Sequence, residues 1–208
     1  MNFKGIFNID AEVKESAHAR VNLIGEHTDY TGGYVMPTLL SFKNTIEITE
    51  NNTNEFIVYS QYFKEKKEFN DFKKSSNNEW VDYIKGCLHI FFEENKISSR
   101  YLNIYISSDI PLERGISSSS ALCVATLKAL NTFFETKIKD PEIAKLAKKV
   151  EFNYIGVSGG IMDQMVSSIG IHGKAFFMNC KNLEYELIDF PENWKFCLVD
   201  SEVQRNLR

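Results

Sequence analysis

Residues 101–134 read YLNIYISSDIPLERGISSSSALCVATLKALNTFF, and this stretch holds the clearest structural signals in the chain. Its first residues alternate as YLNIYI, which predicts a strand over Tyr101–Ile106. Pro111 ends this strand, and the chain then turns at Gly115. Four serines, Ser117–Ser120, lead into ALCVATLKALNTFF, which has the apolar pattern of a long helix. The stretch therefore predicts a strand, a turn and a helix in direct succession.

Strand-like runs dominate the chain before this stretch. They are rich in Val, Ile, Thr and Tyr, which are enriched in β-strands. The predicted strands are Val21–Ile24, Tyr34–Leu40, Thr45–Thr49 and Phe56–Ser60. The polar run Glu65–Glu79 then predicts a surface loop, and apolar side chains spaced by three and four residues over Trp80–Glu93 predict an amphipathic helix.

Helices and strands are mixed in the part of the chain that follows. Asp140 and Pro141 predict a helix start, with aspartate as the N-cap and proline in the first turn. A glycine-rich turn, GVSGG, precedes a further predicted helix from about Ile161. The last predicted strands are Lys174–Asn179, Leu183–Ile188 and Phe196–Val199. Strands first and then a mixture predict the α+β class, with a mixed sheet packed against helices.

The composition is that of a folded, soluble protein. The 208 residues suit one large domain or two small ones, and an apolar content of 43% can fill a core. The formal net charge of −4 and the lack of long Lys/Arg clusters argue against binding to nucleic acids or membranes. The N-terminus lacks the apolar core of a signal peptide, and no apolar run approaches the roughly 20 residues of a membrane span. We therefore expect a cytoplasmic protein whose four cysteines are buried, reduced thiols.

The serine run Ser117–Ser120 lies where the long helix is predicted to begin. The first N–H groups of a helix lack partners within it and lie at the positive end of its dipole. Such an end can bind phosphate, and serine hydroxyls add donors or a ligand for Mg²⁺. A serine-rich helix cap without a ligand would have the same sequence. No P-loop lysine motif and no GxGxxG motif follows a strand here, so a nucleotide site at this place belongs to another class.

The segment Arg20–Gly33, RVNLIGEHTDYTGG, places charged side chains between an apolar strand and a glycine turn. Its carboxylates and its imidazole could together present several hydrogen-bonding groups to one polyol. The residues concerned are Arg20, Glu26, His27 and Asp29. A solvated polar turn is the alternative interpretation.

The segment Glu151–Gln164, EFNYIGVSGGIMDQ, combines glycines with an aspartate. Glycines at 156, 159 and 160 allow the backbone to approach a ligand closely. Asp163 falls near a helix start among apolar neighbours, where it could take a proton or pair with a cation such as Arg20. An aspartate that only satisfies the backbone donors of that helix is the alternative.

Together these segments resemble the galactokinase family of the GHMP kinase superfamily. The resemblance rests on Arg20–Tyr30 (RVNLIGEHTDY), Trp80–Gly86 (WVDYIKG), Gly115–Ala121 (GISSSSA) and Gly160–Gln164 (GIMDQ). Their order and spacing agree with the family over nearly the whole chain. The resemblance implies the fold of the GHMP kinase N-terminal domain, which is ribosomal protein S5 domain 2-like.

The resemblance also implies an activity, the transfer of the γ-phosphoryl group of ATP to the anomeric hydroxyl of α-D-galactose. It implies that Asp163 is the catalytic base or charge partner and that Arg20 stabilises the transferring phosphoryl group. The implied sugar-binding residues are Glu26, His27, Asp29, Gly160 and Asp163. The implied ATP-binding residues are Gly115, Ser117, Ser118, Ser119 and Ser120, with Trp80 and Tyr83 on the adenine side. Ser119 and Glu151 are the implied ligands of Mg²⁺.

The chain departs from the family pattern at a few positions. His18-Ala19 replaces the usual Pro-Gly before the arginine, Ser120 replaces an alanine, and Glu113 and Arg114 stand where glycines open the phosphate motif. Galactokinases are also roughly twice as long. We therefore expect residues 1–190 to form the N-terminal domain and residues 191–208 to begin a C-terminal domain that completes the site.

Two other functions are compatible with these motifs. One is a related sugar 1-kinase that acts on N-acetylgalactosamine or arabinose. The other is a non-catalytic sensor of galactose and ATP.

Overall fold

The structure is a computed structural model that describes residues 2–111, 114–191, 193–194 and 196–199. Its strands are β1 (Val13–Asn22), β2 (Tyr34–Val35), β3 (Pro37–Glu50), β4 (Phe56–Ser60), β5 (Glu65–Phe69), β6 (Leu102–Ser108), β7 (Lys174–Asn179) and β8 (Tyr185–Asp189). Its helices are α1 (Phe3–Phe7), α2 (Trp80–Asn95), α3 (Ser118–Phe133), α4 (Asp140–Lys149), the π-helical segment η1 (Val150–Ile155) and α5 (Met162–Ile169).

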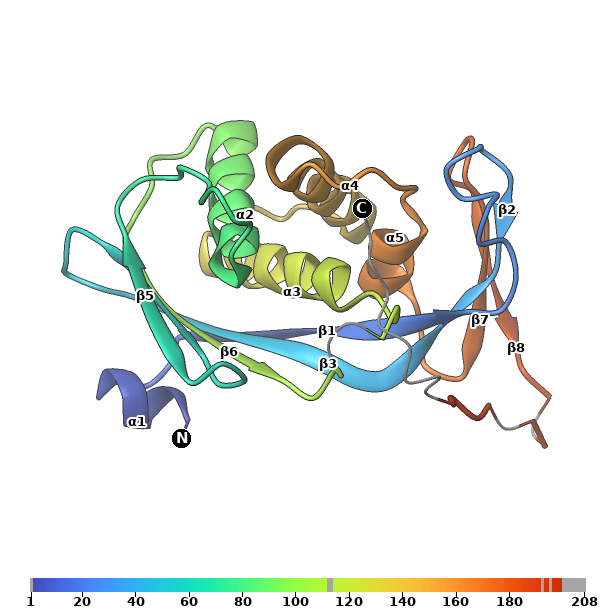
Figure 1. Cartoon of the computed structure of the whole chain (residues 1–208), viewed down its shortest axis with the longest axis horizontal. Helices are drawn as coiled ribbons and strands as arrows, with labels where there is room; N and C mark the ends of the chain where they lie inside the picture. The colour runs from blue at the N-terminus through green and yellow to red at the C-terminus, as the bar shows by residue number, and fades with distance from the viewer. Residues whose placement is uncertain (1, 112–113, 192, 195, 200–208) are drawn as a thin grey trace.

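The eight strands of the described residues join one mixed sheet. Its main path runs in the order β2-β7-β3-β6-β4-β5, while β1 pairs with β3 and β8 pairs with β7. β4 and β6 are parallel, whereas the other pairs are antiparallel. Helices α2 to α5 lie on one face of the sheet, and the short α1 lies below its opposite face (Figure 1). The α+β class and the mixed sheet packed against helices are therefore confirmed.

The core fills the space between this sheet and its helices. In α2 the residues whose spacing predicted a helix, Val81, Ile84, Leu88 and Phe91, are all buried. They pack in one cluster with apolar side chains of α3 and with residues of β3, β4 and β6. Burial of such side chains is the main favourable term in folding. The core therefore holds α2 and α3 rigidly over the sheet, which places the start of α3 beside β1.

Most of the predicted elements are confirmed, and several boundaries differ. β4 and β7 have the predicted bounds, and helices occur close to the predicted positions of α2, α3, α4 and α5. β1 begins eight residues before Val21, because its first residues pair with β3 from Val13 onward. β3 is one long strand where two runs were predicted, and its pairing with β6 spans Asn44–Glu50.

Three local predictions are wrong. The first residues of the expected loop Glu65–Glu79 form β5, a charged edge strand that pairs with β4. Phe196–Val199 has no strand structure. Asp140 is the first residue of α4, and Lys139 is its N-cap. The cysteines also differ in burial: all four are free, but only Cys87 and Cys123 are buried, Cys180 is half-buried and Cys197 is exposed.

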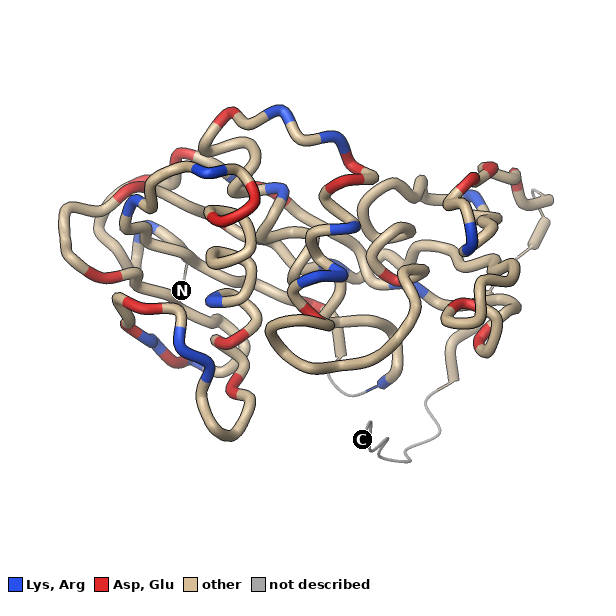
Figure 2. Tube along the Cα trace, turned by 90° about the horizontal axis from the view of Figure 1, so that it is seen from above, with Lys and Arg blue, Asp and Glu red and all other residues tan. Residues whose placement is uncertain are grey.

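Residues of both charge signs are distributed along the whole described trace, and neither sign occupies one end alone (Figure 2). No helix formed by the described residues is both long enough and apolar enough to cross a membrane.

Candidate active site

Arg20 is the centre of the candidate site. It follows an irregularity in the pairing of β1 with β3 between His18 and Arg20, and such irregularities redirect side chains. Its guanidinium binds both carboxylate oxygens of Asp163, from Nε to Oδ1 over 2.6 Å and from Nη2 to Oδ2 over 2.9 Å. Nη1 donates to the carbonyl oxygen of Gly115 over 3.1 Å. One guanidinium therefore joins β1, the turn before α3 and the first turn of α5.

Ser117 directly precedes α3 and has an unusual backbone conformation. As the N-cap it has φ 62° and ψ 43°, in the left-handed region that non-glycine residues rarely adopt. Its hydroxyl makes no capping bond to the helix and donates instead to Oδ2 of Asp163 over 2.5 Å. The start of α3 is thus left without a side-chain cap. Its first N–H groups can therefore serve an anion at the positive end of the helix dipole.

Glu151 forms a second, deeper cluster beside this pair. It lies in η1, and π-helical turns are frequent at functional sites. The residue is 6% exposed, and its carboxylate accepts hydrogen bonds from Ser119 Oγ at 2.7 Å, Ser120 Oγ at 2.7 Å and Gln164 Nε2 at 2.5 Å. Burial raises the pKa of Glu151 above its ordinary value, while these three donors oppose the shift. The serine run therefore connects the Arg20–Asp163 pair to a buried acid.

Asp29 and Gly160 form a third group, at the start of α5. Oδ1 of Asp29 accepts hydrogen bonds from the backbone N–H groups of Ile161, over 2.9 Å, and Met162, over 3.1 Å. The same carboxylate packs so closely on Gly160 that a Cβ there would lie 1.8 Å from its Cγ. Asp29 thus satisfies backbone donors at the start of α5, and Gly160 must be glycine to admit it.

Glu26 and His27 lie apart from these clusters. Both are exposed, and His27 Nδ1 lies 2.8 Å from the hydroxyl of Tyr30. Within the described residues, Glu26 makes no hydrogen bond or ion pair. The structure therefore brings Asp29, Gly160 and Asp163 to one helix start, but it leaves the other two predicted sugar ligands at the surface.

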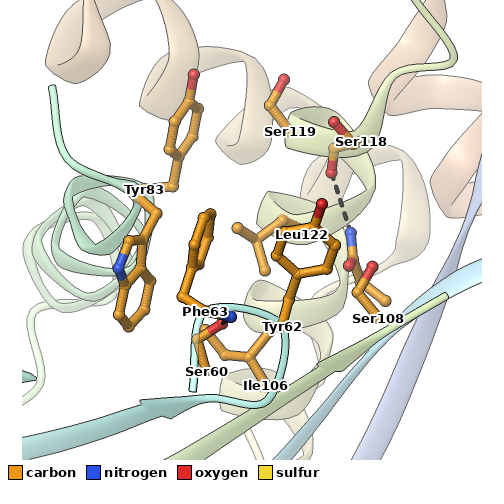
Figure 3. Close-up of a pocket in the computed structure, with 11 residues that line it drawn as sticks. Ser60, Tyr62, Phe63, Tyr83, Ile106, Ser108, Ser118, Ser119 and Leu122 are labelled. Carbon is orange, nitrogen blue, oxygen red and sulfur yellow. Dashed lines mark hydrogen bonds between the residues drawn. The ribbon is translucent and has the colours of Figure 1, made fainter. Parts of the chain in front are cut away.

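A pocket of about 190 Å³ opens beside the serine run (Figure 3). Its wall includes Tyr62, Phe63, Trp80, Tyr83, Ser118, Ser119 and Leu122. The rings of Phe63 and Trp80 are stacked with centroids 5.7 Å apart, and burial raises the pKa of Tyr83 to about 12. Pockets that enclose a whole drug-sized ligand measure about 300–1,000 Å³. This one therefore suits a single ring system, next to the start of α3.

The donor set around Glu151 suits Mg²⁺ only together with phosphate oxygens. Among the residues that the structure describes, no group of three or more His, Cys, Asp or Glu side chains could hold a metal ion. Glu151 and Ser119 nevertheless offer hard oxygen ligands 2.7 Å apart. Mg²⁺ in nucleotide sites is typically held by one or two carboxylates together with substrate phosphates and water. The residues present fit that pattern.

Sequence reasoning missed several residues of the site. Tyr62 and Phe63 follow the predicted strand Phe56–Ser60 after one intervening residue, and an aromatic pair just after a strand was a usable signal. Lys148, which reaches the Gly159–Gly160 turn, carries no such signal, because it resembles any other lysine of an amphipathic helix. Glu113, one of the departures from the family pattern, lies outside the described residues.

Comparisons with known proteins identify the family to which the chain is similar. The family description "GHMP kinases N terminal domain" matches residues 82–170, and "Galactokinase galactose-binding signature" matches residues 1–49. The galactokinase of Thermotoga petrophila is 36% identical over 196 residues, which are 94% of this chain and 55% of that protein. The galactokinase of Pyrococcus furiosus is 36% identical over 198 residues, or 95% of this chain and 55% of that protein.

Solved structures show the same likeness. Lactococcus lactis galactokinase, crystallised in complex with galactose, matches with a TM-score of 0.82 and 29% identity over 96% of this chain and 55% of that one. Mevalonate kinase of Methanococcus jannaschii matches with a TM-score of 0.72 at 24% identity, over 86% of this chain and 56% of that one, which shows a shared fold alone. The chain thus spans about half the length of the relatives it matches. Its two family matches and its fold together show that the chain belongs to the GHMP kinase family and corresponds to the N-terminal region of a galactokinase.

Proposed function

We propose that this chain is part of an ATP-dependent kinase that phosphorylates the anomeric hydroxyl of α-D-galactose to give galactose 1-phosphate. The observation that carries the proposal is the bidentate Arg20–Asp163 pair, tied by Ser117 to an uncapped helix start. The match of residues 1–49 to a galactose-binding signature supports galactose as the sugar. Phosphoryl transfer depends mainly on positioning and on neutralising oxygen charge, and this arrangement can supply both.

In this mechanism the Asp163 carboxylate orients the C1 hydroxyl of the sugar and receives its proton. The hydroxyl oxygen then bonds to the γ-phosphorus of ATP as the bond to ADP breaks. Arg20 keeps the carboxylate in place through two hydrogen bonds and offers positive charge to the phosphoryl oxygens. The N–H groups at the start of α3 bind phosphate oxygens, together with the hydroxyls of its serines.

The sugar is bound from the other side of Asp163. We assign Asp29 and the backbone of Gly160 to the sugar-binding side, because they lie at the same helix start as Asp163. Glu26 and His27 belong to the galactose-binding signature and are exposed, so they are free to contact sugar hydroxyls.

Glu151 and Ser119 would hold Mg²⁺ on the phosphate side. Mg²⁺ would neutralise charge on the ATP phosphates when bound. Burial raises the pKa of Glu151, and a cation beside it would favour its ionised form. The hydroxyls of Ser119 and Ser120 hold the carboxylate at the edge of the phosphate site.

The pocket lined by Trp80 and Tyr83 would take the adenine ring. Aromatic walls bind a flat ring by stacking, and this pocket is continuous with Ser118 and Ser119. A nucleotide lying from this pocket to the start of α3 would direct its γ-phosphate toward Arg20.

The curated relatives are about twice as long, which supports a two-domain protein. We assign residues 1–190 to its N-terminal domain and residues 191–208 to the beginning of its C-terminal domain, which would complete the sugar site. We place its activity in the cytoplasm, where ATP is available.

The test is Mg-ATP-dependent phosphorylation of galactose by the chain and by any longer protein that contains it, with Asp163→Asn as the control. N-acetylgalactosamine and arabinose are compared as substrates. Turnover of galactose that the control lacks supports the proposal, and preferred turnover of another sugar changes the substrate. Binding of galactose and ATP by the longer protein without turnover would contradict it and favour a sensor.

A further inference from the structure

The turn before α5 has little structure of its own to hold it. Residues 156–160 are GVSGG, and glycine loses more conformational freedom on folding than any other residue. Gly159 has no neighbouring heavy atom within 4 Å of the place where a Cβ would lie. Yet this turn must hold Gly160 against the Asp29 carboxylate and set where α5 begins. Some contact outside the turn must therefore restrain it.

Lys148 supplies that contact from α4. Its ammonium group donates hydrogen bonds to the carbonyl oxygens of both Gly159 and Gly160. The lysine belongs to a helix whose apolar side is buried, so its stem starts from a rigid support. Hydrogen bonds from a charged donor are stronger than neutral ones. Two of them on adjacent carbonyls restrain the flexible turn directly.

The charge of Lys148 also interacts with the carboxylates of the site. Burial lowers the pKa of Lys148, while the carboxylates of Asp29, Glu151 and Asp163 oppose this shift by favouring its charged form. A single ammonium group thus lies within electrostatic reach of one carboxylate from each of the three clusters.

We propose that Lys148 is a positioning residue of the sugar site, whose ammonium group ties the Gly159–Gly160 turn to α4 and so fixes the start of α5. This role rests on the proposed function only for the identity of the ligand, galactose, that the site binds. The restraint on the turn itself belongs to this chain whatever ligand it takes.

The first experiment measures the restraint without any ligand. In Lys148→Met, which keeps the stem and loses the ammonium group, the amides of Ile161 and Met162 should exchange hydrogen about 10- to 100-fold faster by NMR, as expected when charged hydrogen bonds are lost. Lys148→Arg should restore part of the protection. Lys145→Met, on the same helix with an exposed ion pair, is the matched control and should leave exchange unchanged.

Two results would overturn the proposal. Unchanged exchange at Ile161 and Met162 in Lys148→Met would show that the ammonium group does not restrain the turn. Equally faster exchange throughout α3 would show that the lysine only stabilises the fold.

The second experiment locates the effect at the sugar. By calorimetry on a longer protein that contains the chain, Lys148→Met should weaken galactose binding about 10- to 100-fold, because charged hydrogen bonds of that strength no longer hold the turn, and leave Mg-ATP affinity within about twofold. Lys148→Arg should recover most of the loss. Equal weakening of both ligands would refute a role at the sugar. If a longer protein that contains the chain binds no galactose while Lys148→Met still frees the turn, the proposed function fails and the restraint stands.

Discussion

The Arg20–Asp163 pair should contribute measurably to stability, and Asp163→Asn is the substitution that tests it. Asparagine has nearly the same shape as aspartate but lacks its charge. One of its two terminal atoms becomes an NH₂ group, which would face a guanidinium donor where a carboxylate oxygen now accepts. The hydroxyl of Ser117 also loses a charged acceptor if that group replaces Oδ2.

The size of the effect follows from burial. Breaking a buried ion pair by removing one partner costs about 3–5 kcal/mol, whereas an exposed pair contributes about 0–1 kcal/mol. The Arg20 and Asp163 side chains are 16% and 25% exposed, so the pair lies nearer the buried limit. We therefore expect Asp163→Asn to lower the free energy of unfolding by about 2–3 kcal/mol. For a chain of this size that corresponds to a fall in Tm of about 4–12 °C.

The assay is thermal and urea unfolding of the chain, with Asp189→Asn as the matched control. Asp189 pairs with Lys174 over 2.7 Å, but its side chain is 79% exposed, so its loss should cost no more than about 1 kcal/mol. The double variant Arg20→Gln, Asp163→Asn should cost less than the sum of its single variants, because both remove one interaction. Equal shifts for Asp163→Asn and Asp189→Asn would refute the reasoning.

Three further predictions concern other parts of the site. Gly160→Ala should lower the Tm by several °C or displace the Asp29 carboxylate, because the new Cβ would lie 1.8 Å from its Cγ. Gly159→Ala should do neither, because open space surrounds that position. Trp80→Ala should weaken ATP binding measured by calorimetry and leave galactose binding unchanged, because Trp80 lines the pocket on the far side of the serines. Burial, followed by the charge of His172, lowers the pKa of His18 below 6.5, so the folded state binds fewer protons than the unfolded state. Stability should therefore fall as the pH drops below about 6.5, and His18→Asn should reduce this loss in urea titrations at pH 7 and pH 5. An equal loss in both proteins would contradict the assignment to His18.

The elements with a strong apolar pattern could be predicted from the sequence alone. The alternation of YLNIYI predicted β6, and the spacing of apolar side chains predicted α2, because the periods of strands and helices determine which residues face a core. β5 escaped prediction for the same reason. Its charged sequence shows no apolar pattern at all, and the strand exists because backbone groups of β4 pair with it. Only four residues separate the two strands, but backbone pairing of this kind leaves no signal in the side chains of β5.

For the candidate site, the residue types could be predicted from the sequence, but the contacts between them could not. The residue types were visible in three short segments, since carboxylates, an arginine, serines and glycines stand out between apolar runs. The resemblance of these segments to a kinase family implied that Arg20 and Asp163 lie together. The individual contacts were not visible, because the two residues are 143 positions apart and meet only where β1 and α5 pack on α3.

Tertiary structure alone decided how these residues are used. It turned the hydroxyl of Ser117 away from its own helix and toward Asp163, and it engaged Asp29 with the start of α5. It also brought Lys148 to the glycine turn, although nothing in the sequence distinguishes this lysine from its neighbours on α4. The sequence by itself determined the fold class and the chemical groups, since these follow from local periodicity and residue type. Only packing could decide which groups meet, because each of these contacts joins separate elements of the chain.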